Sequence, residues 1–309
     1  MKRFFFILSV GLMAVSCWSH SDRLKVDIDK ALKKQVDARE LYSEASAIPL
    51  RFPRPTTLGQ EISLLDVAAD RFFLLDREKN GILVFDRNGE YVTTITVADT
   101  VLDFSVYRDR VLDVLTEKAI TEYSVTDGGF LAEYPVRDLD VMLKSVARVT
   151  EDGLFMLGTQ DGHAYDCTYL ISKGRFYPAA RPAPDYLSTH ALFPASEFQN
   201  SRFFRCDGIV YSFGSRSGQI AKYTDDYFIC IPYQWDFGKR APVFTNAQKT
   251  TGKVYLAFTL DGKDYVLVYN LDNRKNKVVA SDTFPLGIIY AGRNYCFSPS
   301  DRAIICYTL

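Results

Sequence analysis

Side chains that bind transition metals or act as nucleophiles are few in this sequence. Its 309 residues include 3 His and 6 Cys. The histidines, His20, His163 and His190, lie far apart, and neither an HExxH helix nor a pair of CxxC motifs occurs, although zinc sites need such clusters. The sequence therefore predicts no metal site and no cofactor.

Two short segments resemble catalytic or metal-binding motifs. Residues 214–218 read Gly-Ser-Arg-Ser-Gly, but Arg216 stands where a GxSxG hydrolase needs its nucleophilic serine. Residues 261–264 read Asp-Gly-Lys-Asp, which is too short for an EF-hand loop. We interpret both as turns and favour a protein without catalytic activity. A carbohydrate-active enzyme, either a polysaccharide lyase or a glycoside hydrolase, stays open as the alternative, because two carboxylates that act on a glycosidic bond need only meet in space.

The charge of the chain is balanced. It has 37 Lys and Arg against 38 Asp and Glu, a formal net charge of -1. A protein that binds nucleic acid needs a basic face to neutralise phosphates. We therefore expect no nucleic-acid partner.

The N-terminus has the pattern of an export signal. Lys2 and Arg3 precede an apolar run over residues 4–15, which is too short to span a bilayer. Ala14-Val15-Ser16-Cys17 resembles a bacterial lipobox, with Ala14 where leucine is usual. We expect residues 1–16 to be a signal peptide and Cys17 to carry a lipid that anchors the protein to a membrane. Ordinary signal-peptidase cleavage nearby is the alternative.

The other cysteines do not form a disulfide pattern. There are five of them, most in apolar or aromatic stretches, and five cannot all pair with one another. We predict that they are small buried residues, with one disulfide pair as the alternative. They are Cys167, Cys206, Cys230, Cys296 and Cys306.

An internal repeat organises the rest of the chain. Six segments share an apolar stretch, a polar turn and a second stretch that ends in an aromatic ring, and successive rings are 38 to 54 residues apart. The rings are Phe85, Tyr123, Tyr169, Tyr223, Tyr269 and Tyr307. The first repeat contains four strand-like stretches, at residues 62–67, 72–76, 81–86 and 91–97. A period of 40 to 50 residues with four strands is typical of a propeller blade. The sequence predicts an all-β protein, a six-bladed β-propeller.

The last repeat is incomplete, because residues 288–309 contain only three strands. We expect an N-terminal strand at residues 48–52 to complete it and close the ring. Residues 24–28 alternate as a short strand, and residues 31–47 are weakly helical. This predicts a linker with a short strand and a short helix at residues 17–47, followed by a single propeller at residues 48–309.

Several of these segments together resemble the six-bladed β-propeller lipoproteins of Bacteroidetes. The segments are residues 48–50, 73–76, 82–86, 88–91 and 235–238. The sequence departs from that family at Arg51 and Phe52, where an acidic residue and a threonine are usual. The resemblance implies the fold and export to the periplasm or surface of a Gram-negative envelope, including its outer membrane, and it implies no catalytic residue.

One face of the predicted propeller has the features of a binding surface. The turn between strands two and three and the connection to the next blade lie on the same face, and each such turn has a basic or imidazole side chain. These are Arg77, Lys118, His163, Arg216, Lys263 and Arg302. The long connection at residues 178–200 adds Tyr186 and His190. Acidic residues in the same turns oppose this charge. We predict a binding or scaffold protein whose partner is another protein or a glycan, for which this face would suit an anionic or polyhydroxylated ligand.

Overall fold

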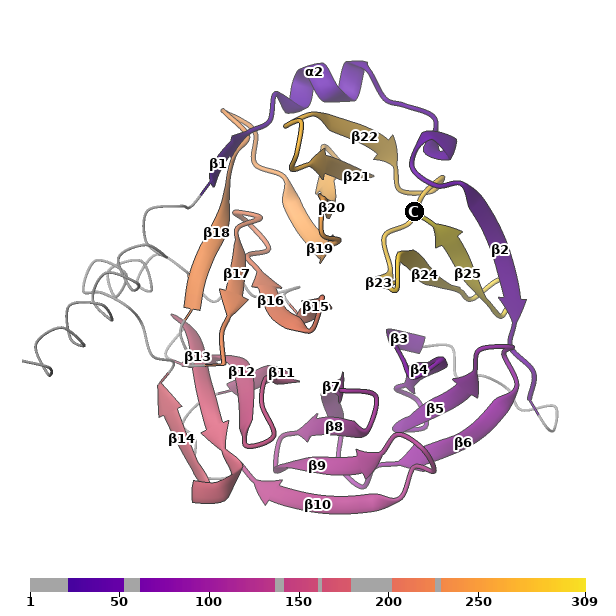
Figure 1. Ribbon diagram of the computed structural model, residues 1–309, viewed down its shortest axis with the longest axis vertical. Helices are drawn as coiled ribbons and strands as arrows, with labels where there is room; N and C mark the ends of the chain where they lie inside the picture. Colours follow the sequence, from indigo (N-terminus) through magenta and orange to yellow (C-terminus); the bar gives the residue numbers. More distant parts are fainter. Residues whose placement is uncertain (1–21, 53–61, 137–141, 161–162, 179–201, 226–228) are drawn as a thin grey trace, which may run out of the picture.

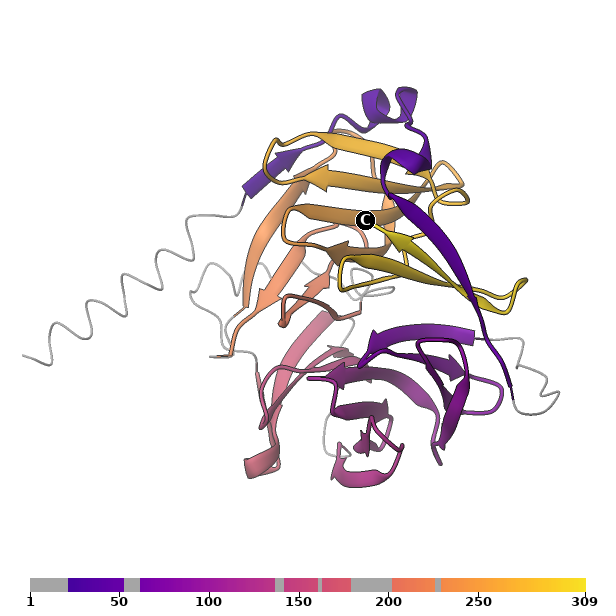
Figure 2. The same cartoon turned by 45° about the vertical axis from the view of Figure 1, so that its right-hand side comes forward.

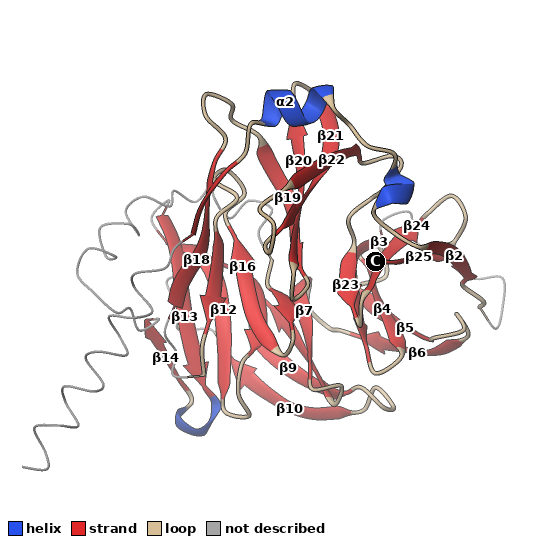
Figure 3. Ribbon diagram, turned by 45° about the horizontal axis from the view of Figure 1, so that its top comes forward, coloured by secondary structure: helices blue, strands red, loops and turns tan. Residues whose placement is uncertain are grey.

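The computed structural model describes residues 22–52, 62–136, 142–160, 163–178, 202–225 and 229–309. Within these residues, six sheets stand around a common axis (Figure 1). Nearly every element is a strand, as Figure 3 shows. The six-bladed β-propeller predicted from the repeat is confirmed.

Each blade is built from four antiparallel strands, with one parallel strand added to blade 4, and its first strand lies nearest the axis. Blade 1 contains β3 (Ile62–Ala68), β4 (Arg71–Asp76), β5 (Gly81–Asp86) and β6 (Tyr91–Thr96). Blade 2 contains β7 (Val101–Tyr107), β8 (Val111–Thr116), β9 (Ala119–Ser124) and β10 (Phe130–Pro135). Blade 3 contains β11 (Met142–Arg148), β12 (Gly153–Gln160), β13 (His163–Leu170) and β14 (Arg175–Pro178), with the 3₁₀ turn η2 (Ile171–Lys173) before β14.

Two of the other three blades, blades 4 and 6, receive a strand from the N-terminal segment. Blade 4 contains β15 (Phe204–Cys206), β16 (Ile209–Phe213), β17 (Ile220–Tyr223), β18 (Ile229–Asp236) and, outermost, β1 (Asp22–Lys25). Blade 5 contains β19 (Val243–Lys249), β20 (Lys253–Leu260), β21 (Lys263–Asn270) and β22 (Asn276–Ala280). Blade 6 contains β23 (Ile288–Tyr290), β24 (Arg293–Ser298), β25 (Ala303–Thr308) and, outermost, β2 (Glu44–Pro49).

The N-terminal segment runs along the outside of blades 4, 5 and 6 (Figures 1 and 2). β1 pairs in parallel with β18, and α2 (Ile28–Lys33) and η1 (Ala38–Glu40) lead to β2, which pairs antiparallel with β25. The outer strand of blade 6 is therefore Glu44–Pro49, not residues 48–52; Arg51 instead bridges to Glu90 of blade 1.

The described part of the expected linker belongs to the propeller. Leu24, Val26 and Ile28 are each 2% exposed, because they pack into the core between blades 4 and 5. Residues 22–47 contain a short strand, β1, and a short helix, α2, and the apolar side chains that alternate along them are buried against an outer sheet edge. In the described residues, no helix is long and apolar enough to cross a bilayer.

Apolar side chains from adjacent sheets fill the space between blades. The repeated rings take part: Phe85, Tyr169, Tyr223 and Tyr269 are buried, whereas Tyr123 and Tyr307 are partly buried. Cys206, Cys296 and Cys306 are free and buried as predicted, and burial raises the pKa of Cys206 to about 11 and of Cys296 to about 12. The side chains of Cys167 and Cys230 lie outside the described set.

Candidate functional site

A cavity of about 590 Å³ lies where the six blades meet, and every blade contributes to its wall. We call it the axial cavity. Its wall includes residues from the inner strands and from the segments that lead into them, such as Leu65 of β3, Leu102 of β7 and Ile288 of β23. Arg77 and Ser281 also line it; these lie on the face with the turns between strands two and three and the connections between blades. We call this face the connection face.

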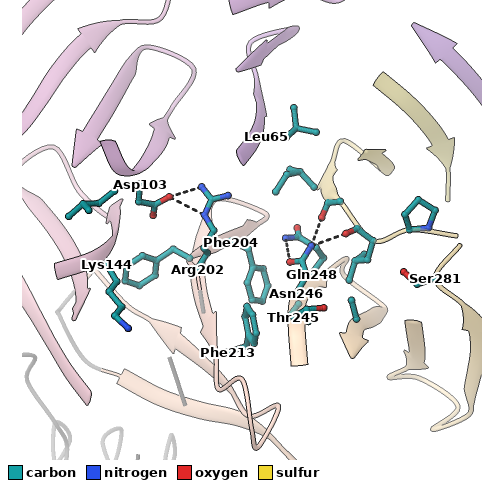
Figure 4. A pocket seen from close by; sticks show the side chains of 18 of the residues that line it. Leu65, Asp103, Lys144, Arg202, Phe204, Phe213, Thr245, Asn246, Gln248 and Ser281 are labelled. Atoms are coloured by element: carbon teal, nitrogen blue, oxygen red, sulfur yellow. Dashed lines mark hydrogen bonds and ion pairs between the residues drawn. The ribbon is translucent and has the colours of Figure 1, made fainter. Parts of the chain in front are cut away.

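One part of the cavity wall is aromatic. Phe203, Phe204 and Phe213 of blade 4 line the cavity beside Leu65 of blade 1, and Figure 4 shows Phe204 and Phe213 close together below Arg202. Planar apolar side chains in a cavity with a few polar groups are typical of small-molecule sites.

An ion pair forms another part of the wall. Arg202 Nη2 lies 2.7 Å from Asp103 Oδ1, and Arg202 Nε donates to the same oxygen at 3.0 Å (Figure 4). The other carboxylate oxygen accepts hydrogen bonds from Ser145 Oγ at 2.5 Å and from the backbone N–H of Val146 at 3.2 Å. Asp103 thus has partners on both oxygens and positions Arg202, whose side chain stays 29% exposed.

Two further cations line the cavity without a carboxylate partner among the described residues. Lys144 of β11 is half-buried, and Arg77 is exposed in the turn between β4 and β5. Arg77 Nη1 donates to the backbone carbonyl of Val101 at 3.2 Å, and no ion pair to Arg77 occurs among the described residues. The described wall therefore has three cationic side chains and one carboxylate, an excess that attracts anions.

Amide side chains hold the opposite wall in place. Asn246 Nδ2 donates to the carbonyls of Leu286 at 3.0 Å and Gly287 at 2.9 Å, and Gln248 Oε1 accepts from the N–H of Ile289 at 3.1 Å. Blade 5 is thereby tied to blade 6. Gly287 also lies close to β24 of blade 6, since a Cβ there would lie 1.8 Å from the carbonyl oxygen of Tyr295. Contacts within the protein therefore fix this wall.

The structure brings only one of the residues predicted from the turns into the described wall of the cavity. Arg77 lines it, whereas Lys118, Arg216, Lys263 and Arg302 do not. Lys118 pairs instead with Asp99 on the same face, and Lys263 and Arg302 are exposed. The side chain of His163, and Tyr186 and His190 altogether, lie outside the described residues.

Sequence reasoning missed Lys144, Arg202 and Asp103. All three lie in an inner strand or just before one, outside the turns from which the binding residues were predicted. The sequence does contain a signal for two of them, because Lys144 and Asp103 are charged residues between apolar residues of their inner strands.

A second charged cluster lies between blades 2 and 3, away from the cavity. Arg148, at the far end of β11, donates from Nη2 to Asp113 Oδ1 at 2.6 Å and from Nε to Oδ2 at 3.1 Å, and it also pairs with Glu122. The side chains of Arg148 and Asp113 are 4% and 0% exposed. Burial raises the pKa of Asp113 to about 6, although Arg148 opposes the shift. We call this set the buried triad.

A known protein family has this architecture. The model of the DUF5128 family, described as a 6-bladed beta-propeller, matches residues 16–281. The chain belongs to this family. No curated protein sequence matches the chain.

Solved structures with the propeller's architecture share little sequence with it. A protein described as exported, from Bacteroides fragilis, has a TM-score of 0.65 at 11% identity, with 88% of this chain and 96% of that chain covered. A Bacteroides thetaiotaomicron protein of unknown function has a TM-score of 0.55 at 11% identity, covering 85% and 75%. An inactive virginiamycin B lyase of Staphylococcus aureus, solved with quinupristin, has a TM-score of 0.52 at 14% identity, covering 84% and 83%. At such identities the likeness shows the fold alone.

Proposed function

We propose that this propeller is an exported binding protein that holds an anionic, polyhydroxylated ligand, such as the end of an acidic glycan, in its axial cavity. The observation that supports it is the excess of cations on a preformed wall: Lys144, Arg77 and Arg202 against Asp103 alone among the described residues. The cavity volume is within the range of about 300–1,000 Å³ usual for small-ligand sites.

The aromatic part of the wall supports a sugar-like ligand. Phe203 is half-buried and offers flat apolar surface to a sugar ring, and Phe204 and Phe213 are buried in the same part of the wall. Thr245 and Ser281 bring hydroxyl groups to the cavity. A ligand with a ring, hydroxyls and a carboxylate would use all of these groups.

The alternative, a polysaccharide lyase or glycoside hydrolase, receives less support from this cavity. Glycoside hydrolysis generally needs two carboxylates that flank the bond, and a proton-abstracting base must be free to accept a proton. In the described wall the only carboxylate is Asp103, which is bound by Arg202 and Ser145. We therefore favour binding without catalysis.

The binding proposal is tested by titration calorimetry with uronic-acid oligosaccharides and their neutral counterparts. Acidic oligosaccharides should bind, and more weakly as salt rises, because exposed charges are screened over about 10 Å at 0.1 M. Arg77→Glu should weaken binding by about tenfold or more. Lys263→Glu is the matched control, because Lys263 begins the third strand of blade 5 but does not line the cavity. No binding of any acidic oligosaccharide, or equal losses in both variants, would contradict the proposal.

We also propose that Cys17 anchors the protein by lipid to a Gram-negative envelope, in the periplasm or on the cell surface. The signal-like N-terminus and the lipobox-like residues 14–17 support this, as does the likeness to a Bacteroides protein described as exported. Cys17→Ala should move the protein from the membrane to the soluble fraction, measured after a high-salt wash. A variant that stays with the membrane would overturn the lipid anchor.

A further inference from the structure

The inner strands of four blades share one irregularity. Their pairing with the second strand shifts between Ile62 and Leu64, Val101 and Asp103, Leu143 and Ser145, and Phe244 and Asn246. In each case one extra residue is inserted, as in a β-bulge. The inserted residues are Ser63, Leu102, Lys144 and Thr245.

The four bulges occupy the same place in the repeat. In every case the residue of the second strand that pairs directly after the bulge is the fifth residue of that strand: Leu75, Leu115, Leu157 and Ala257. In blades 2, 3 and 5 the residue before the inserted one and the residue two after it lie three apart and are both buried, such as Val101 with Phe104 and Phe244 with Ala247. In a regular strand, residues three apart would point to opposite faces. The bulge thus keeps both of these residues in the core.

Three of the four inserted residues, Leu102, Lys144 and Thr245, line the cavity. A bulge redirects the side chain at its position, so this placement is its expected effect. Their neighbours maintain the blade contacts: Ser145 bonds to Asp103, and Asn246 bonds to the carbonyls of Leu286 and Gly287. A side chain at the bulge position can therefore change without disturbing the packing between blades.

We propose that the bulge position determines which ligand the axial cavity accepts, and that Lys144 there binds the carboxylate of an acidic sugar. This rests on the proposed function. Lys144 is half-buried and has no described carboxylate partner, so its ammonium is available to a ligand. Thr245, at the same position of blade 5, offers a hydroxyl to the sugar's hydroxyl groups, and Leu102 offers apolar contact.

The experiment compares Lys144→Met with wild type, using a galacturonate trisaccharide and the matching neutral galactose trisaccharide as probes. The substitution keeps an unbranched side chain, one atom shorter, and removes its charge. We expect affinity for the acidic probe to fall about tenfold or more, the cost of one charged hydrogen bond. Affinity for the neutral probe should change less than about twofold, which is about 0.4 kcal/mol.

Lys118→Met is the matched control, because Lys118 lies on the same face, pairs with Asp99 and does not line the cavity. It should leave the affinity for both probes unchanged. If Lys144→Met keeps the preference for the acidic probe while Arg77→Glu abolishes it, the role of Lys144 is wrong and the proposed function stands. If wild type binds neither probe nor any other acidic oligosaccharide, the proposed function itself fails. Equal binding of both probes by wild type would also overturn the assignment of Lys144.

Discussion

Lys144 and Arg148 are both cations on β11, but their burial and their partners differ. Lys144 lies at the bulge of β11, half-buried in the cavity wall, with no carboxylate partner among the described residues. Arg148, at the last position of the same strand, is 4% exposed and is held by Asp113 and Glu122 of blade 2. The difference teaches that an inner-strand cation serves the fold where a neighbouring blade presents carboxylates, and is available to a ligand where a bulge places it in the cavity wall.

The physical cost of removing each cation follows from its surroundings. Breaking a buried ion pair leaves an uncompensated charge in a medium that solvates it poorly, at a cost of about 3–5 kcal/mol. A cation that retains access to water and has no partner contributes little to stability. The buried triad should therefore matter for folding, and Lys144 should not.

The largest effect is expected for Arg148→Met. It leaves Asp113 and Glu122 buried without their cation, so the free energy of unfolding should fall by about 3–5 kcal/mol. Lys144→Met also replaces a cation with methionine, four residues earlier in β11. Its free energy of unfolding should stay within about 0.5 kcal/mol of wild type. Urea unfolding followed by circular dichroism measures both. Equal losses in the two variants would remove the distinction between the ends of this strand.

The fold could be predicted because its signal is repeated. The aromatic ring that ends each third strand appears six times, and most of these rings are buried between sheets. The outer strand of blade 6 was harder to place. Residues 44–47 read Glu-Ala-Ser-Ala and are mostly exposed, so they have no apolar pattern. Their pairing with β25 depends on backbone hydrogen bonds, which any such residues can make.

The cavity was harder to predict than the fold. A charged turn can be recognised from sequence, but whether it reaches the axis depends on the length and direction of the loop; among those described, only Arg77 does. Arg202 contacts Asp103 across 99 residues of sequence, which no local pattern reports. The bulges do leave a trace, since a pair such as Leu102-Asp103 or Lys144-Ser145 separates two buried apolar residues three apart.

A smaller effect is expected from pH at the buried triad. Burial raises the pKa of Asp113 from 3.8 to about 6, against the opposing charge of Arg148. Between these values the folded state holds a proton that the unfolded state has lost. The stability contributed by this group is therefore complete below about pH 4 and is lost as pH rises through about 6.

The test is the difference in unfolding free energy between wild type and Asp113→Asn, measured in urea from pH 4 to pH 7. Asparagine keeps the shape and cannot titrate, so wild type should lose on the order of 1–3 kcal/mol relative to the variant across this range. Lys144→Met is the control from the other end of β11, and its difference from wild type should stay flat, because the substitution leaves the buried triad unchanged. Parallel curves for wild type and Asp113→Asn would show that Arg148 keeps Asp113 ionised throughout. The triad would then be a fully charged ion-pair network, and the cost expected for Arg148→Met would be at the upper end of its range.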